Sequence, residues 1–139
     1  MFKNILIAVD GSEHSHKAAK TAGDLARTLS ADLWLVVAYE PLPTYLGQPN
    51  LQKAINARMK FTESILQMAL ETIGSIPGIL RQEVLEGPPA EAILTVAETR
   101  KVDLIVMGTR GLGRLAGLLI GSVSQRVVSQ AGCPVLLVR

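Results

Sequence analysis

The chain has 139 residues, of which 48% are hydrophobic and 19% are charged, with a formal net charge of +2. That balance is typical of a folded domain and excludes a disordered chain, while the scattered Lys and Arg residues argue against a nucleic-acid partner. No apolar run reaches the roughly 18 to 20 residues that a membrane-spanning helix needs. We therefore expect one domain over residues 1–139, in the cytoplasm, with no nucleic-acid partner and no membrane partner.

Cysteine and histidine are too few for a disulfide or a metal centre. Cys133 is the one cysteine, and a small buried thiol before Pro134 is its plainest interpretation. His14 and His16 stand where the first helix is expected, without a cluster of Cys, His or acidic residues at metal spacing. The sequence therefore gives no sign of redox chemistry or of a metal held by the protein alone.

The first residues predict a strand followed by a helix. Phe2 to Val9 is an almost continuous apolar run, which is typical of a strand buried on both faces of a parallel sheet. From Ser12 to Leu29 the apolar residues return at helical spacing, and Ser12 or Asp10 is placed to cap the first turn. We expect this strand, turn and helix to be the unit that the rest of the chain repeats.

The same alternation predicts seven further elements. In chain order they are a strand at 32–38, a helix at about 50–73, a strand at 81–86, a helix at about 89–100, a strand at 103–107, a helix at about 122–130 and a strand at 134–138. Pro41 to Pro49 is rich in Pro and Gly, which indicates a surface loop. Five strands separated by four helical segments predict an α/β fold, a doubly wound five-stranded parallel sheet with helices on both faces.

The turn after the fourth strand is the candidate ligand site, because ligands of such sheets bind outside the carboxyl ends of the strands. It runs from Gly108 into a helix that begins at Ser122 and is dense in glycine. Glycine lets backbone N–H groups approach an anion, and the first N–H groups of a helix attract phosphate. Arg110 and Arg114 add positive charge, and the hydroxyls of Ser122 and Ser124 can donate to phosphate oxygens.

Three other interpretations of this turn are weaker. A purely structural loop needs neither so many glycines nor two arginines beside a helix start. The Gly-x4-Gly-Lys-Ser/Thr motif of P-loop proteins is absent. Residues 111–116 fit the pattern Gly-x-Gly-x-x-Gly/Ala, but they do not directly follow a strand, and no acidic residue lies about twenty positions later to bind a ribose. NAD is therefore disfavoured as the ligand.

The turn does match the spacing Gly-x2-Gly-x9-Gly-Ser, in Gly108, Gly111, Gly121 and Ser122. With the segments around it, this motif resembles the ATP-binding branch of the universal stress protein family. The resemblance covers the whole chain, most clearly in residues 5–12, 35–37, 102–108 and 133–138. It implies the strand order 3-2-1-4-5, which would place Asp10 and Gly108 at the ends of adjacent strands.

The resemblance also implies that ATP, with Mg²⁺, is the ligand. Asp10 would lie beside the ribose and the metal-bound phosphates, and the backbone of Val37 would meet the adenine edge. The turn and the following helix start would bind the ribose and the phosphates. The residues expected to contact the nucleotide are Asp10, Gly11, Ser12, Val37, Gly108, Arg110, Gly111, Gly121, Ser122, Val123 and Ser124, with Asp10 as the metal ligand.

Three functions fit such a site. A regulatory protein would bind ATP and pass this information to an unknown protein partner in a stress response. A slow ATPase or phosphotransferase would need a residue that orients or deprotonates a nucleophile, and the candidates Asp10, Glu40 and Glu86 have no obvious partner. An interaction module with a vestigial pocket would not need the complete glycine motif. The sequence favours the regulatory binder and assigns no catalytic residue.

The last strand predicts a homodimer. Val135 to Val138 is apolar, and in the implied order it lies at a sheet edge without a Lys or Pro that would hinder pairing. A twofold partner that lays its own last strand antiparallel would satisfy the free backbone groups of both copies. The alternative is an edge that is covered by a loop of the same chain.

Overall fold

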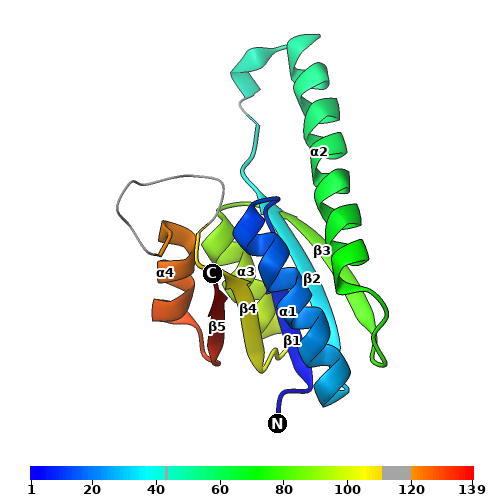
Figure 1. Ribbon diagram of the computed structural model, residues 1–139. Coiled ribbons are helices and arrows are strands. Elements are labelled where there is room, and N and C mark those ends of the chain that lie inside the picture. Colours follow the sequence, from blue (N-terminus) through cyan, green and yellow to red (C-terminus); the bar gives the residue numbers. More distant parts are fainter. Residues whose placement is uncertain (43, 111–119) are drawn as a thin grey trace.

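The computed structural model describes residues 1–42, 44–110 and 120–139, which form a five-stranded sheet with α-helices around it (Figure 1). The strands are β1 (Asn4–Ala8), β2 (Asp32–Tyr39), β3 (Leu80–Glu86), β4 (Leu104–Gly108) and β5 (Val135–Val138). The helices are α1 (Glu13–Leu29), α2 (Asn50–Ile73), α3 (Pro89–Thr99) and α4 (Ser122–Gln130), with a short 3-10 helix, η1 (Thr44–Leu46), before α2.

All neighbouring strands run parallel, in the order β3-β2-β1-β4-β5. The predicted doubly wound α/β fold is therefore confirmed, including the strand order. The predicted boundaries are close to those of the structure, and the largest difference is the start of the first strand, at Asn4 instead of Phe2. The segment predicted as a loop, residues 41–49, contains η1.

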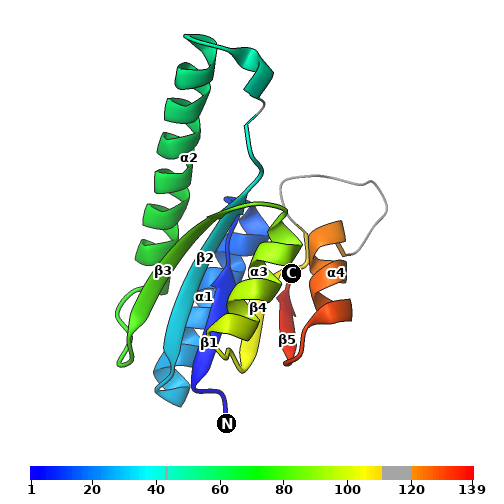
Figure 2. The same cartoon turned by 180° about the vertical axis from the view of Figure 1, so that it is seen from behind.

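The helices cover both faces of the sheet, as the two opposite views show (Figure 1 and Figure 2). Helices α1 and α2 pack on one face, where Ile5 and Ile7 of β1 belong to the core. Helices α3 and α4 pack on the other face, where Leu6 and Ala8 belong to a second core. Successive side chains of a strand point to opposite faces, so burial on both sides requires the continuous apolar runs seen in the sequence.

Helix α2 extends well past the sheet. Its 24 residues correspond to about 36 Å of helix. The C-terminal half packs on the sheet and is buried at Ile65, Ala69 and Ile73, whereas the first half projects beyond the carboxyl ends of the strands (Figure 1). We call residues 50–60 of this half the arm. In the described ranges, none of the helices has the length and apolar character needed to cross a membrane.

Candidate functional site

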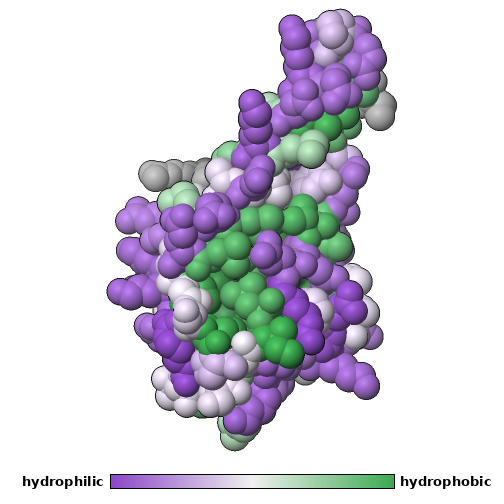
Figure 3. All heavy atoms as spheres, turned by 90° about the vertical axis from the view of Figure 1, so that its right-hand side faces the viewer, coloured by the Kyte–Doolittle hydropathy of each residue, from purple (hydrophilic) through white to green (hydrophobic). Residues whose placement is uncertain are grey.

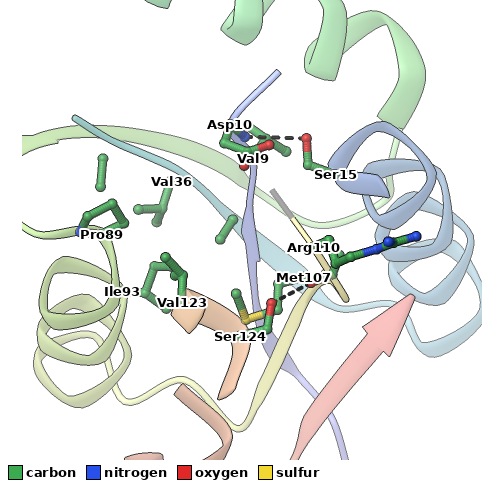
Figure 4. Close-up of a pocket in the computed structure, with 13 residues that line it drawn as sticks. Val9, Asp10, Ser15, Val36, Pro89, Ile93, Met107, Arg110, Val123 and Ser124 are labelled. Atoms are coloured by element: carbon green, nitrogen blue, oxygen red, sulfur yellow. Dashed lines mark hydrogen bonds between the residues drawn. The ribbon is translucent and has the colours of Figure 1, made fainter. Parts of the chain in front are cut away.

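A hollow opens at the carboxyl ends of β1, β2 and β4, next to the first turns of α3 and α4 (Figure 4). It lies where the strand order reverses, because β1 has β2 on one side and β4 on the other. The residues that line it are Ala8, Val9, Asp10, Ser15, Val36, Ala38, Pro89, Ile93, Met107, Gly108, Arg110, Val123 and Ser124. Five of the predicted site residues are thus brought together: Asp10, Gly108, Arg110, Val123 and Ser124.

The hollow has an apolar side and a polar side. Val36 comes from β2, and Pro89 and Ile93 come from the start of α3 (Figure 4). Asp10 and Ser15 lie on the α1 side of the same hollow. A flat apolar group with a polar or charged extension would match this division.

Asp10 is held in a defined turn between β1 and α1. Its Oδ1 accepts a hydrogen bond from the backbone N–H of Ser12 at 2.9 Å, and its own backbone N–H donates to Ser15 Oγ at 3.3 Å. The hydroxyl of Ser15 donates in turn to the carbonyl of Ser12 at 3.0 Å. One carboxylate oxygen is therefore used locally, and the turn fixes the side chain at the edge of the hollow.

Gly11 and Ser12 are placed apart from the hollow. Ser12 caps α1, because its Oγ accepts a hydrogen bond from the N–H of Ser15 at 3.2 Å. Gly11 has a φ of 87°, which glycine adopts without strain. Both residues border a different hollow, between α1 and α2. In the structure these two residues shape the turn and the helix start, and the prediction that they contact a nucleotide stays untested.

The start of α4 is tied to the end of β4 by two hydrogen bonds. Ser124 is buried, and its hydroxyl donates to the carbonyl of Gly108 at 2.7 Å (Figure 4). The N–H of Gly121 donates to the carbonyl of Thr109 at 2.6 Å. The Ser124 hydroxyl, predicted to donate to phosphate, therefore donates to a carbonyl within the protein.

Helix α4 begins without a side-chain cap. Gly121 occupies the N-cap position with φ −72° and ψ 164°, and the first bond of the helix runs from the N–H of Gln125 to the Gly121 carbonyl at 2.9 Å. Ser122 is exposed and Val123 half-buried at this end. No side chain within the described ranges takes the place that Ser12 has on α1. As far as residues 1–42, 44–110 and 120–139 are concerned, no side chain caps the N–H groups of the first turn, and such groups attract anions.

Val37 lies one position away from the residues that face the hollow. Its side chain is buried in the core under α1 and α2, while Val36 and Ala38 line the hollow. Only the backbone of Val37 was expected to meet a ligand, and that expectation is untested. Successive side chains of a strand point to opposite faces, so Val36 and Ala38 share the face opposite to that of Val37. The sequence identifies them as lining residues once the face of β2 that borders the hollow is known.

Gly111 and Arg110 belong to the predicted ribose and phosphate turn. Gly111 falls in the range 111–119, which lies outside the described residues. Arg110 is exposed and borders the hollow, and its side chain extends away from Pro89 and Val36 (Figure 4).

Asp10 is the one carboxylate among the lining residues in the described part of the chain. Glu40 is exposed, and Glu86 borders a separate groove beside α2. Across the described ranges, no three His, Cys, Asp or Glu side chains form a group that could hold a metal ion. A metal at this site would therefore need oxygen ligands from a bound molecule in addition to Asp10.

Some solved structures with this fold carry nucleotides. A universal stress protein in complex with cAMP is 26% identical, with a TM-score of 0.72 and coverage of 99% of this chain and 97% of that one. A universal stress protein from Archaeoglobus fulgidus in complex with dAMP is 19% identical, with a TM-score of 0.68 and coverage of 100% and 98%. The likeness to the second structure establishes a shared fold alone.

The sequence matches the family model of the universal stress protein family over residues 1–139. A universal stress protein of Thermus aquaticus is 48% identical, with 100% of both chains covered. The universal stress protein YxiE of Bacillus subtilis is 34% identical, again with 100% of both chains covered. The structure of universal stress protein UspA from Lactobacillus plantarum has a TM-score of 0.86 at 24% identity and covers 99% of this chain and 98% of that one. The chain therefore belongs to the universal stress protein family.

Proposed function

We propose that this protein binds ATP in the hollow at the carboxyl ends of β1, β2 and β4 and acts as a nucleotide-responsive regulator in a stress response. The observation that carries the proposal is the uncapped start of α4 beside a hollow with one apolar side. A purine ring suits the apolar side, and a phosphate chain suits the N–H groups of the first helical turn. The family membership and the nucleotide complexes of two structural relatives support the same ligand class.

The adenine would lie against Val36, Pro89 and Ile93, which give the hollow its apolar side. The phosphates would extend towards Gly121 and Ser122, where the helix dipole favours negative charge. The hydrogen bond from Ser124 to Gly108 holds the start of α4 beside the end of β4. This fixed spacing would let one ligand reach both the strand ends and the helix start.

Mg²⁺ would accompany the ATP. Asp10 accepts one hydrogen bond through Oδ1 from Ser12, which leaves its other oxygen for a metal or a ribose hydroxyl. Magnesium is commonly bound through one or two carboxylates together with substrate phosphates, so a single carboxylate in the hollow fits this ion.

We expect regulation rather than rapid hydrolysis. A phosphoryl-transfer enzyme needs a residue that orients or deprotonates the nucleophile. Among the described residues that line the hollow, Asp10 is the one candidate, and its role as a metal or ribose ligand competes with that task. Turnover with Mg²⁺ should stay well below the typical enzyme value of about 10 per second. A rate at or above that value would favour the ATPase alternative.

The proposed regulator is a homodimer through β5. This strand lies at the sheet edge, and Leu136 is 37% exposed. An antiparallel partner strand would pair the free backbone groups and cover that side chain. An unknown protein partner would then respond to the occupancy of the two nucleotide sites.

Calorimetric titration of ATP with Mg²⁺ into wild type and Gly121→Leu tests the nucleotide site. A leucine side chain would stand where the phosphate approaches α4, and each lost charge-assisted hydrogen bond is worth roughly 1.5 to 3 kcal/mol. Losing two should weaken binding about a hundredfold or more. Gly132→Leu is the matched control, since Gly132 follows α4 and has open space around it.

The two variants separate the outcomes. The proposal expects wild-type affinity in Gly132→Leu and a large loss in Gly121→Leu, with unchanged circular dichroism in both. Undiminished affinity in Gly121→Leu would place the nucleotide elsewhere. Parallel titrations with AMP and cAMP would show whether the triphosphate is preferred, and tighter binding of a monophosphate would contradict ATP as the ligand.

A further inference from the structure

Helix α2 carries a second apolar stripe besides the one that packs on the sheet. Its members recur at alternating spacings of three and four residues, the pattern of the core positions of a coiled coil. They are Ala54, Ala57, Phe61, Ser64 and Met68. We call these five residues the α2 seam. On a helix this spacing aligns side chains along one line of the surface.

The α2 seam is partly open to solvent. Phe61, Ser64 and Met68 border the hollow between α1 and α2 on one side, and Ala54 is half-buried. Phe61 is 51% exposed and Met68 59% exposed, and Ala57 is exposed as well. The hydroxyl of Ser64 donates to the carbonyl of Phe61 at 2.7 Å, so this polar group is satisfied within the helix. The α2 seam therefore offers apolar surface without an unsatisfied hydrogen-bonding group.

The arm is apolar on a further side as well. Leu51, Ile55 and Met59 line a groove that faces β2 and β3, and Met59 is 65% exposed. Seen from the β3 side, the visible surface of the arm is mostly hydrophilic, and a continuous hydrophobic area lies on the body below it (Figure 3). Apolar residues on two sides of one helix are typical of a helix that packs against another element.

The charges of α2 are separated along its length. The half from residue 50 to 61 holds Lys53, Arg58 and Lys60 and no acidic residue, while the half from 62 to 73 holds Glu63 and Glu71 and no basic residue. These five side chains take part in none of the ion pairs found within the described residues. Arg58 donates to the carbonyl of Glu40 at 2.8 Å and lies over the ring of Tyr39, so Lys53 and Lys60 carry the positive charge that a partner helix would meet. Parallel pairing of two such helices would bring like charges together, and antiparallel pairing would bring opposite charges together.

We propose that α2 forms an interface with α2 of a second copy of this chain, antiparallel about a twofold axis near Phe61. Phe61 lies at the middle of the helix, so the two helices would overlap over their full length. Ala54 would then face the partner's Met68, and Ala57 would face the partner's Ser64. Each pair contains at least one small residue, so the two helices can pack closely. A surface that is complementary to itself in shape and charge is what a twofold contact requires.

This interface is separate from the one proposed at β5. Helix α2 and strand β5 lie at opposite sides of the sheet (Figure 1), so one chain could use both surfaces at once. The α2 contact does not involve the nucleotide hollow, and failure of the ATP proposal would leave it unaffected.

Disulfide cross-linking in a Cys133→Ser background tests the contact. A residue on a twofold axis meets its own copy, so Phe61→Cys should form a disulfide dimer at least about tenfold faster than Asn56→Cys, because paired helices hold the two thiols at millimolar effective concentration. Asn56 is exposed on the polar side of the same helix and serves as the matched control. Equal rates for the two variants would overturn the proposal.

A mixing experiment tests the direction of the helices. Ala54→Cys mixed with Met68→Cys should give the mixed disulfide faster than either variant links to itself. Faster self-linking of Ala54→Cys would show a parallel contact and contradict the antiparallel one. Sedimentation provides a second measurement: Phe61→Lys should halve the mass of the wild-type assembly, while Asn56→Lys should retain it. An unchanged mass in Phe61→Lys, with unchanged circular dichroism, would also refute the interface.

Discussion

Replacement of Gly108 by alanine should destabilise the protein, because the end of β4 has no room for a methyl group. An ideal Cβ at this position would lie 2.7 Å from Cβ of His14, 2.8 Å from the carbonyl carbon of His14 and 3.0 Å from the nitrogen of Ser15. Two of these atoms belong to the backbone of the first turn of α1, so a change of side-chain rotamer cannot relieve the contact. Either β4 or α1 must shift, and overpacking of this kind costs about 1 to 3 kcal/mol.

Gly132→Ala is the matched control for this prediction. No heavy atom lies within 4 Å of a Cβ built at Gly132, so the same substitution should cause no clash there. It should be neutral or stabilise the protein by about 0.4 to 1 kcal/mol, because alanine lowers the conformational entropy of the unfolded chain. Urea unfolding of wild type and both variants measures the difference. A Gly108→Ala protein within about 0.5 kcal/mol of wild type, the range of ordinary surface substitutions, would refute the packing argument.

Two substitutions and one alkylation measurement test other parts of the molecule. Ser12→Ala removes the cap of α1 and should lower the unfolding free energy by about 1 kcal/mol in urea; no loss would contradict the capping role. Leu136→Lys places a charge on the exposed edge strand and should abolish the β5 dimer in sedimentation, whereas an unchanged mass would contradict that contact. Burial, and then the negative charge of Asp103, raise the pKa of the Cys133 thiol above its ordinary value. At pH 8 its alkylation should therefore be slower in the folded than in the urea-unfolded protein, and the gap should narrow as the pH rises through the raised pKa.

The elements of the fold could be predicted from the sequence because burial imposes a readable pattern. β1 is buried on both faces, so it required a continuous apolar run, and the residues of α1 follow the helical period. The start of β1 differs from the prediction because Phe2 is apolar and half-buried yet lies outside the strand. Apolar character marks burial, and strand assignment depends on hydrogen bonding as well.

The candidate site could be predicted in part. Asp10 and Gly108 follow directly from the rule that ligands bind at strand ends, and the structure places both at the hollow. Pro89 and Ile93 were missed because they belong to α3, which reaches the hollow only through the crossover from β3 to β4. The proline at position 89 could have identified them, because proline is common in the first turn of a helix. It marks where α3 begins, and the residues of that first turn lie at the carboxyl ends of the strands.

The hydroxyl of Ser124 shows a different limit of the sequence pattern. A serine in the first turn of a helix that follows a glycine loop fits phosphate binding, but it fits an internal contact equally well. The structure uses it to bond the carbonyl of Gly108 and buries it to 3% exposure. Local spacing cannot distinguish the two roles, because the partner lies 16 positions away in the chain and on another element.

Gly108 and Gly121 belong to one sequence motif, yet the structure gives them different reasons to be glycine. Gly108 is required by the close approach of α1. Gly121 has a φ of −72°, which any residue adopts, and it stands at an N-cap position where a serine would normally be preferred. Its backbone conformation alone does not call for glycine, which is consistent with the approach of a ligand to α4.

Gly121→Ser turns this difference into a measurement. The new hydroxyl could accept a hydrogen bond from the N–H of Val123 or Ser124, which caps α4 and should keep or raise the stability by a few tenths of a kcal/mol. The same N–H groups are those proposed to bind phosphate, so the cap would compete with the ligand and weaken ATP binding by about tenfold for one lost charge-assisted bond. Urea unfolding and calorimetric titration on the same sample give both values. A variant that gains stability and binds ATP as tightly as wild type would show that the first turn of α4 does not hold the phosphates.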